Sequence, residues 1–211
     1  MVADSVFNQL KHPNPQMRDR AMTEIVNNRD ENTIPTLMTA LGEADVVYRR
    51  ACVKTLGAIG MDSVPAVVDQ MLTAEDDTVR ASCTKAMAQI AVYHPDEPFS
   101  VEGLEGLKKA MADPYPVVQI AAVMSLGEIG MPAVETLLET LKTTDNVAIA
   151  LTITNTLGSI GDPRALDVLR DLIKDDTVDS YVRETAESAL PRLEHVISLR
   201  EAKGSLRNSA V

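Results

Sequence analysis

Large aromatic side chains are almost missing from this chain of 211 residues. It has four Tyr, two Phe and no Trp, 3% in all, although apolar residues make up 45% of the sequence. A buried core must therefore be built from Leu, Val, Ile, Ala and Met, which suits helices that pack closely. The length allows one domain with a sizeable interior.

Cysteine and positive charge are also scarce. Two Cys cannot form a disulfide framework, which indicates a reducing compartment. A net charge of −11 and a pI of about 4.7 make nucleic acid and anionic membrane surfaces poor partners. No apolar run approaches the roughly 20 residues of a membrane span, and the first residues lack the regions of a signal peptide. We expect a cytoplasmic protein with no membrane span and no nucleic-acid partner.

One short sequence recurs along the chain. Leu56-Gly57-Ala58-Ile59-Gly60 returns at 126–130 and, 31 residues later, at 157–161, and weaker copies begin at Met87 and Leu190. Self-similarity at this period is typical of stacked helical hairpins. The sequence therefore predicts an all-α fold, a right-handed α-solenoid of about six helical hairpins. Such arrays usually bind partners along a surface.

The six hairpins can be placed from apolar periodicity and capping residues. Asp45 is suited to begin a helix and Gly60 to end one. The first helices are expected at about 3–11, 33–42, 62–73, 101–112, 131–142 and 163–174, and the second helices at about 15–28, 45–59, 77–92, 116–129, 147–160 and 179–200. We expect one repeat domain over residues 1–197 and a polar C-terminal extension over 198–211.

One interval breaks the period. The spacing between Met87 and Leu126 is 39 residues, about eight longer than its neighbours, and the excess falls at residues 92–99. Two Pro and two acidic residues predict a loop there. The insertion also holds Tyr93 and Phe99, two of the six aromatic residues, and we expect these two to contact a partner or to pack over the groove of the array.

Helical periodicity separates a buried seam from an opposite, open face. The seam of the second hairpin is expected to contain Tyr48, Cys52, Thr55, Leu56 and Ile59. The open face is basic in the second and third hairpins and apolar in the fourth and fifth. We interpret that face as a partner-binding surface, with packing between neighbouring hairpins as the alternative. Its expected binding residues are Arg50, Lys54, Lys85, Ile120, Val123, Met124 and Leu151.

The residues that could carry chemistry favour structural roles. Cys52 and Cys83 lie one period apart on the buried face, and neighbouring helix axes are too far apart for a disulfide between them. His12, His94 and His195 have no Cys at metal-ligand spacing and are expected on the surface. Neither catalytic residues nor a metal site are predicted.

Two further patterns indicate packing. Gly57, Gly127 and Gly158 stand inside helices, where each costs about 1 kcal/mol against Ala, and this suggests close helix approach or room for a partner on the inner face. Arg49, Arg80 and Arg183 recur in one column, four residues after Asp45, Asp76 and Asp179, and are expected to pair with these acids.

The repeated motif resembles the HEAT-like repeats of the phycobilin lyase family, of the E/F type. The residues that carry the resemblance are Val79-Arg80 with Ala86–Ile90, Tyr48–Ala51 with Leu56–Gly60, and the segments Val6–Pro15 and Asn32–Pro35. It covers nearly the whole chain, and Ala150 departs from it at the position that Arg49, Arg80 and Arg183 occupy in other hairpins. In that family the cysteine that receives the bilin belongs to the client phycobiliprotein, so the resemblance assigns no such role to Cys52 or Cys83.

The resemblance implies one of three functions. The first is a non-catalytic scaffold or chaperone in phycobiliprotein or phycobilisome maturation in a cyanobacterium. The second is a subunit of a heteromeric lyase that attaches bilin together with a second HEAT chain. The third is an adaptor in phycobilisome turnover or iron–sulfur assembly, with an iron–sulfur carrier as partner. No resident cofactor is expected, although bilin is possible as a transient ligand.

Overall fold

Helices are the only regular elements of the part of the chain that the structure describes. The structure is a computed structural model that describes residues 4–208, with side chains as far as Lys203. The expected all-α solenoid class is confirmed. The chain divides into two compact units, residues 1–128 and 129–211.

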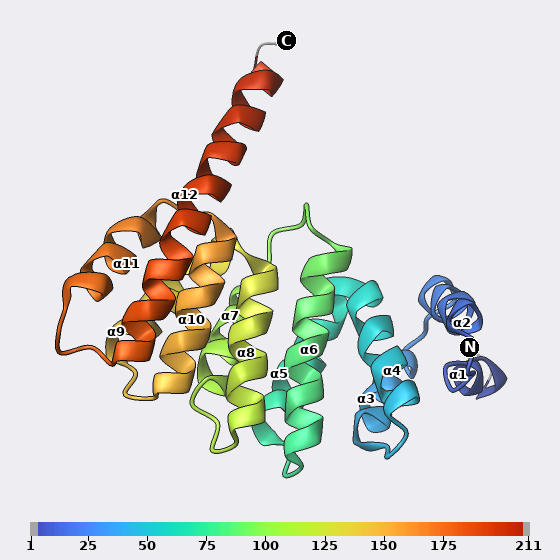
Figure 1. The fold of residues 1–211 in the computed structure, drawn as a ribbon. Coiled ribbons are helices and arrows are strands. Elements are labelled where there is room, and N and C mark those ends of the chain that lie inside the picture. The colour runs from blue at the N-terminus through green and yellow to red at the C-terminus, as the bar shows by residue number, and fades with distance from the viewer. Residues whose placement is uncertain (1–3, 209–211) are drawn as a thin grey trace. The chain divides into compact units, whose positions relative to one another are not determined.

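In the first unit, helical hairpins stack in two layers. Second helices lie side by side in one layer, and first helices form the layer behind them (Figure 1). The helices are α1 (Asp4–Gln9), α2 (Pro15–Asn27), α3 (Thr33–Thr39), α4 (Val46–Ile59), α5 (Val64–Thr73), α6 (Asp77–Tyr93), α7 (Val101–Ala110) and α8 (Pro116–Ile129), with 3₁₀ turns η1 (Ala40–Gly42) and η2 (Gly60–Ser63). All lie within a few residues of their predicted positions.

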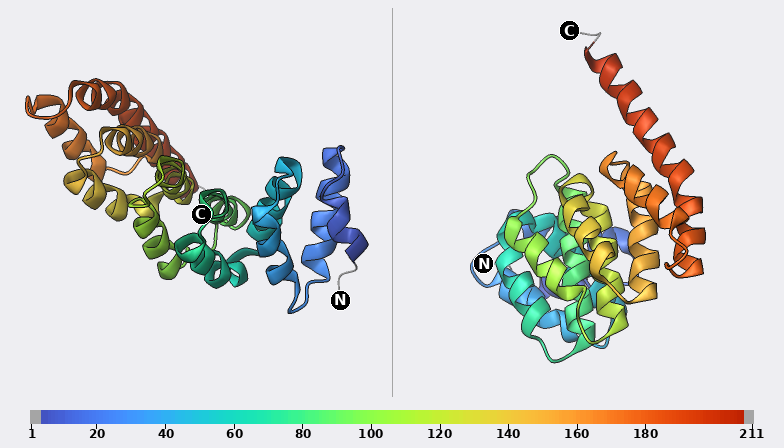
Figure 2. Two further views of the ribbon diagram at one scale, coloured as in Figure 1. Left: turned by 90° about the horizontal axis from the view of Figure 1, so that it is seen from below. Right: turned by 90° about the vertical axis from the view of Figure 1, so that its left-hand side faces the viewer.

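The second unit repeats the pattern. After the 3₁₀ turn η3 (Met131–Ala133) come α9 (Val134–Thr143), α10 (Val147–Ile160), α11 (Arg164–Lys174) and α12 (Ser180–Asn208). Helix α12 packs on α10 and α11, and its C-terminal part projects beyond both (Figure 2). It is continuous through Asn208, so most of the polar extension predicted at 198–211 is helical, and its last three residues lie outside the described part.

Local chemistry explains where the helices begin and end. Carboxylate or amide oxygens of Asn14, Asp45, Asp76 and Asn146 accept hydrogen bonds from the first free backbone N–H groups of α2, α4, α6 and α10. The helices α4 and α10 stop at Gly60 and Gly161, whose φ angles of 86° and 74° suit glycine.

The core consists of the expected aliphatic seam. In α4, the side chains of Tyr48, Cys52, Thr55, Leu56 and Ile59 are all buried, as predicted. The stretch Val46–Thr73 has the length and composition of a membrane span. In the fold, however, it comprises α4, η2 and α5, and 67% of its apolar window is buried in the structure. Its apolar character is therefore accounted for by the core.

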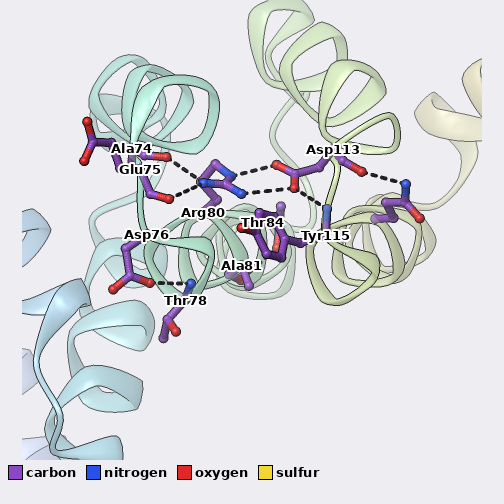
Figure 3. Close-up of polar contacts among 10 residues, drawn as sticks. Ala74, Glu75, Asp76, Thr78, Arg80, Ala81, Thr84, Asp113 and Tyr115 are labelled. Carbon is purple, nitrogen blue, oxygen red and sulfur yellow. Dashed lines mark hydrogen bonds and ion pairs between the residues drawn. The ribbon is translucent and has the colours of Figure 1, made fainter.

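The recurring arginine caps the preceding helix rather than pairing with the predicted aspartate. Arg80 Nη1 donates to the carbonyl oxygens of Ala74 and Glu75 at 2.7 and 2.9 Å (Figure 3). Arg18 and Arg49 make the same kind of contact with carbonyls five or six residues earlier, and the Gln119 amide does so in the fourth hairpin. These donors satisfy carbonyls that are left without partners between helices.

The expected Arg–Asp pairs are therefore wrong. Asp45 and Asp76 are helix caps, and the carboxylate that meets Arg80 is Asp113, 33 residues away, at 2.7 Å. Both side chains of this ion pair are nearly buried, with 9% and 8% exposed, and the Tyr115 ring lies 5.3 Å from the guanidinium carbon. In the second unit Arg183 pairs with Asp176 at 2.7 Å, not with Asp179. The Arg80–Asp113 contact ties consecutive hairpins of the first unit together.

Two helix glycines mark close helix contacts, as expected. A Cβ at Gly57 would overlap Gln89 of α6, including its backbone. In the second unit, a Cβ at Gly158 would lie 2.9 Å from the Ala189 Cβ of α12. For Gly127 close approach stays a prediction.

The insertion is tied to the first unit. His94 is half-buried, and its Nε2 donates to the Ala58 carbonyl at 3.2 Å while Nδ1 lies 3.0 Å from Glu97 Oε1. The prediction of a surface histidine is therefore wrong for His94, whose ring contacts the left-handed turn at Gly60. His12 and His195 are exposed, as expected.

Candidate functional site

A groove runs along the exposed faces of α4, α6 and α8, entirely within the first unit. Its volume is about 860 Å³. Each helix contributes residues three or four positions apart, which places one continuous stripe per helix in the groove. The lining residues are Val46, Arg49, Arg50, Val53 and Lys54 from α4; Ser82, Lys85, Ala88, Gln89 and Val92 from α6; and Val117, Ile120, Ala121, Met124, Ser125 and Glu128 from α8. We call it the α4–α6–α8 groove.

Five of the predicted binding residues meet in this groove. Arg50, Lys54, Lys85, Ile120 and Met124 all line it, although the first and last stand 74 positions apart in the sequence. The reason is the stacking of repeats, which brings equivalent positions of successive second helices side by side (Figure 1). A basic stripe and an apolar stripe therefore face one space.

The cations of the groove are available for a partner. Arg50, Lys54 and Lys85 are exposed, and none of them forms a salt bridge or hydrogen bond with any described residue. By contrast, Arg49 donates to the Glu43 carbonyl at 2.6 Å and is held in the cap described above. Three unpaired positive charges in a chain of net charge −11 create a local field opposite in sign to the protein as a whole.

The α8 side of the groove is apolar. The exposed fractions of Met124 and Val117 are 61% and 49%, and Ile120 is half-buried. Exposed apolar side chains that adjoin in a hollow, rather than being scattered singly, are a mark of a binding surface. Glu128 is the one charged side chain that α8 contributes.

Val123 does not belong to this surface. It is fully buried, so the expectation that it projects from the open face is wrong. Leu151 lies in the second unit, where it is half-buried and lines a separate hollow of about 300 Å³ with Asn155, Tyr181, Glu184, Thr185 and Ser188. Its role in binding stays a prediction.

Tyr93 and Phe99 do not line the groove either. The Tyr93 hydroxyl donates to the Met22 sulfur of α2 at 3.8 Å, and the half-buried Phe99 ring packs against Gly103 at the start of α7. Both therefore attach the insertion to its own unit, and their contact with a partner stays a prediction. The insertion contributes Val92 to the groove.

The hydroxyl groups in the groove are already engaged. Ser82 Oγ donates to the Thr78 carbonyl at 2.7 Å, and Ser125 Oγ lies 2.6 Å from the Thr84 carbonyl of α6. The amide of Gln89, half-buried at the groove floor, forms no hydrogen bond with a described residue. The groove thus offers charge and apolar area, but few neutral hydrogen-bonding groups.

The two thiols lie away from the groove and are poorly suited to nucleophilic chemistry. Both are free and fully buried, as expected for core residues. Burial raises the pKa of Cys52 and of Cys83 to about 12, so very little of either is thiolate near neutral pH. Among the described residues, no group of three His, Cys, Asp or Glu side chains could hold a metal ion.

Comparison with known proteins identifies the repeat. A family model for HEAT repeats matches residues 3–88 and 104–191, which leaves out the insertion and the projecting end of α12. The chain belongs to the HEAT-repeat family. The resemblance to bilin-related HEAT proteins of cyanobacteria is confirmed by the relatives below.

Two similar proteins come from cyanobacteria. The uncharacterized phycocyanin operon protein Z of Pseudanabaena tenuis (strain PCC 7409) is 52% identical over 200 residues, covering 95% of this chain and 99% of that protein. The bilin biosynthesis protein CpeZ of Synechococcus sp. (strain WH8020) is 27% identical over 178 residues, covering 82% of this chain and 95% of that protein.

Two solved structures are similar to this HEAT-repeat protein at low sequence identity. The complex of CpcE and CpcF of phycocyanin lyase from Nostoc sp. PCC7120 contains a chain that is 20% identical, with a TM-score of 0.47, over 72% of this chain and 95% of that one. A designed armadillo repeat protein matches with 16% identity and a TM-score of 0.45, over 90% and 98% of the two chains.

Some groove residues were not predicted from the sequence. Val46 is the first residue of α4 and Val117 the second residue of α8, and both are exposed. Their signal is a repeated one, because each is an apolar residue at the beginning of a second helix. Arg50 and Lys54 also line a smaller hollow of about 260 Å³ against α2, together with Leu10, Pro15 and Met22. The two cations therefore form a ridge between two hollows.

Proposed function

We propose that this HEAT-repeat protein is a non-catalytic scaffold or chaperone that holds a phycobiliprotein while it is matured or receives its bilin. The observation that carries the proposal is the α4–α6–α8 groove, in which unpaired Arg50, Lys54 and Lys85 face exposed Val117 and Met124. Exposed apolar side chains that adjoin in a hollow are a mark of a binding surface, and the cations beside them supply charge for a partner of opposite sign.

The names of the relatives support the choice of client. One is a phycocyanin operon protein and the other a bilin biosynthesis protein, and the first is similar over nearly its whole length. A second HEAT chain is the other partner consistent with this group. The proposed location is the cytoplasm. An iron–sulfur carrier, the third expectation, finds no support among the relatives.

Capture of a phycobiliprotein tests the proposal. Met124→Glu with Val117→Glu places two charges on the apolar stripe at exposed positions, so the fold should tolerate them while capture of phycocyanin subunits falls at least tenfold. Val101→Glu with Leu72→Glu is the matched control, because both residues are exposed in the same unit, at 75% and 39%, and lie outside the groove. Equal capture by both double variants, each with an unchanged melting curve, would show that the client binds elsewhere.

A second candidate function is that of a lyase subunit acting with another HEAT chain. The observation that favours it is the combination of groove volume and charge. About 860 Å³ is within the range of small-molecule sites, and unpaired cations could meet the propionates of a bilin. Absorbance of the protein purified with bilin would distinguish the two, since a scaffold retains no colour and a bilin-binding subunit retains one that Arg50→Glu with Lys54→Glu abolishes.

A further inference from the structure

The charge and shape of the α4–α6–α8 groove define the kind of protein segment that fits it. We propose that the groove binds an amphipathic α-helix of the client, about three turns long, with carboxylates on the flank facing α4 and apolar side chains on the flank facing α8. The inference rests on the proposed function, and it adds which segment is recognised and how.

The length of the helix follows from the stripes. On α8 the lining runs from Val117 to Glu128, and on α6 from Ser82 to Val92. At a rise of 1.5 Å per residue, these stripes span about 15–17 Å, which is three turns of a bound helix.

The width of the groove also fits one helix. Helix α6 lies between α4 and α8 (Figure 1). Packed axes are about 8–10 Å apart, so the two outer helices are separated by about 16–20 Å. That distance joins the helix axes, so a helix of about 10–12 Å diameter that lies over α6 is within reach of side chains from both outer helices.

The two walls select different flanks of that helix. Arg50 and Lys54 are one turn apart on α4, with Lys85 beside them on α6, and none of the three forms a salt bridge with an acidic residue in the described part of the chain. Opposite them, Val117, Ile120 and Met124 form an apolar stripe of the same pitch. A helix with carboxylates one turn apart, and apolar residues about a quarter turn further round, complements both walls.

The polar groups of the groove favour a helix over an extended strand. An extended segment needs partners for its backbone N–H and C=O groups, whereas a helix satisfies its own. The hydroxyls of Ser82 and Ser125 already donate to helix carbonyls, and Arg49 is held by the Glu43 carbonyl. Among the lining residues, the Gln89 amide alone is a neutral side-chain group without a partner, which is too little for an extended backbone.

Three synthetic peptides test the inference. The probe is a fluorescent alanine-based peptide of about 18 residues, long enough to form helix, with three Glu on one flank and three Leu about 100° round the helix. The second peptide has Lys in place of Glu, and the third has a central Pro that breaks the helix. With the full chain, we expect the Glu peptide to bind at least tenfold more tightly than either of the others, and less tightly as salt is raised.

Charge reversal supplies the decisive control. Arg50→Glu with Lys54→Glu should reverse the preference, so that the Lys peptide binds tenfold more tightly than the Glu peptide. Lys109→Glu with Lys174→Glu changes the net charge equally at exposed sites outside the groove and should leave the preference intact. Circular dichroism on both double variants checks that the fold is unchanged.

Each contrary result excludes a definite part of the inference. Equal binding of Glu and Lys peptides would overturn charge selection, and tight binding of the Pro peptide would overturn the helix. If no peptide binds while phycocyanin subunits are still captured, the helix mode is wrong and the scaffold function stands. If phycocyanin is not captured either, the proposed function fails as well.

Discussion

The open faces of the two units are made by the same repeat, yet they carry opposite charge. In the first unit, Arg50, Lys54 and Lys85 line a hollow of about 860 Å³. In the second unit, α10 and α12 form a hollow of about 300 Å³ that contains Glu184 and no cation. Both units have the aliphatic seam and the close helix contact at a glycine. The core therefore fixes the fold, while the exposed positions are free to specialise.

The units also differ in how their hairpins are joined. Arg80 and Asp113 form a nearly buried ion pair in the first unit, and the guanidinium also donates to two carbonyls. In the second unit, Ala150 stands where the other hairpins have Arg or Gln, and the main buried charge is Asp162, which pairs with Arg164 at 2.7 Å. Substitutions in both units measure these differences.

The largest effect is expected at Arg80. Replacing it with Ala leaves the carboxylate of Asp113 buried, with 8% exposed, and removes the donor to two carbonyls. Loss of one partner of a buried ion pair should lower the free energy of unfolding by about 3 kcal/mol. Urea denaturation measures this as a lower midpoint. Arg49→Ala, which removes one donor from an exposed carbonyl contact, should cost about 1 kcal/mol. Equal costs would show that the Asp113 pair contributes nothing beyond the cap.

Gly57→Ala is expected to rank second. At an open helix position Ala stabilises by about 1 kcal/mol relative to Gly, but here the new Cβ would overlap the backbone of α6. Because α4 and α6 are forced apart, the free energy of unfolding should instead fall by about 2 kcal/mol, which thermal unfolding measures. Gly158→Ala tests the second unit, where the neighbours at 2.9 and 3.0 Å include the flexible end of Arg192, so the cost should be smaller. A stabilised Gly57→Ala protein would contradict the close contact.

The sequence predicts the fold more completely than it predicts the groove. The helix positions followed from the period and the caps, because the same chemical signals recur in each hairpin. Arg50, Lys54, Lys85, Ile120 and Met124 could be assigned to one surface, since equivalent positions of stacked repeats lie side by side.

The remaining features depend on contacts that no local pattern records. Periodicity does not orient Val123 correctly, because apolar residues occur on every side of α8. Sequence proximity favours Asp76 as the partner of Arg80, whereas the actual partner, Asp113, comes from the following hairpin. The contact between His94 and the Ala58 carbonyl joins residues 36 positions apart through an irregular loop.

Asp162 provides a pH-dependent contrast in the second unit. The hydrogen bond from Arg164 holds the pKa of this buried carboxyl below its ordinary 3.8. Because the pKa is lowered on folding, the stabilisation is fully present above the unfolded value and is lost as pH falls through the lower, folded one. Asp162→Asn should therefore cost about 1 kcal/mol at pH 7, with a smaller difference below pH 3.8. A difference that stays constant from pH 7 to about 2.5 would contradict the ion pair.

The smallest effect is expected where the second unit lacks the arginine cap. Ala150 occupies the position of Arg49 and Arg80, and the Thr144 carbonyl, six residues earlier, accepts no hydrogen bond from a described residue. Ala150→Arg places a guanidinium within reach of that carbonyl, as in the first unit, and should stabilise by about 0.5–1 kcal/mol. Ala150→Met is the matched control, because it adds a similar length without donors. Differential scanning calorimetry should show a higher melting temperature for the Arg variant alone. If Met stabilises as much as Arg, the gain comes from covered apolar area, and the cap is not what the second unit lacks.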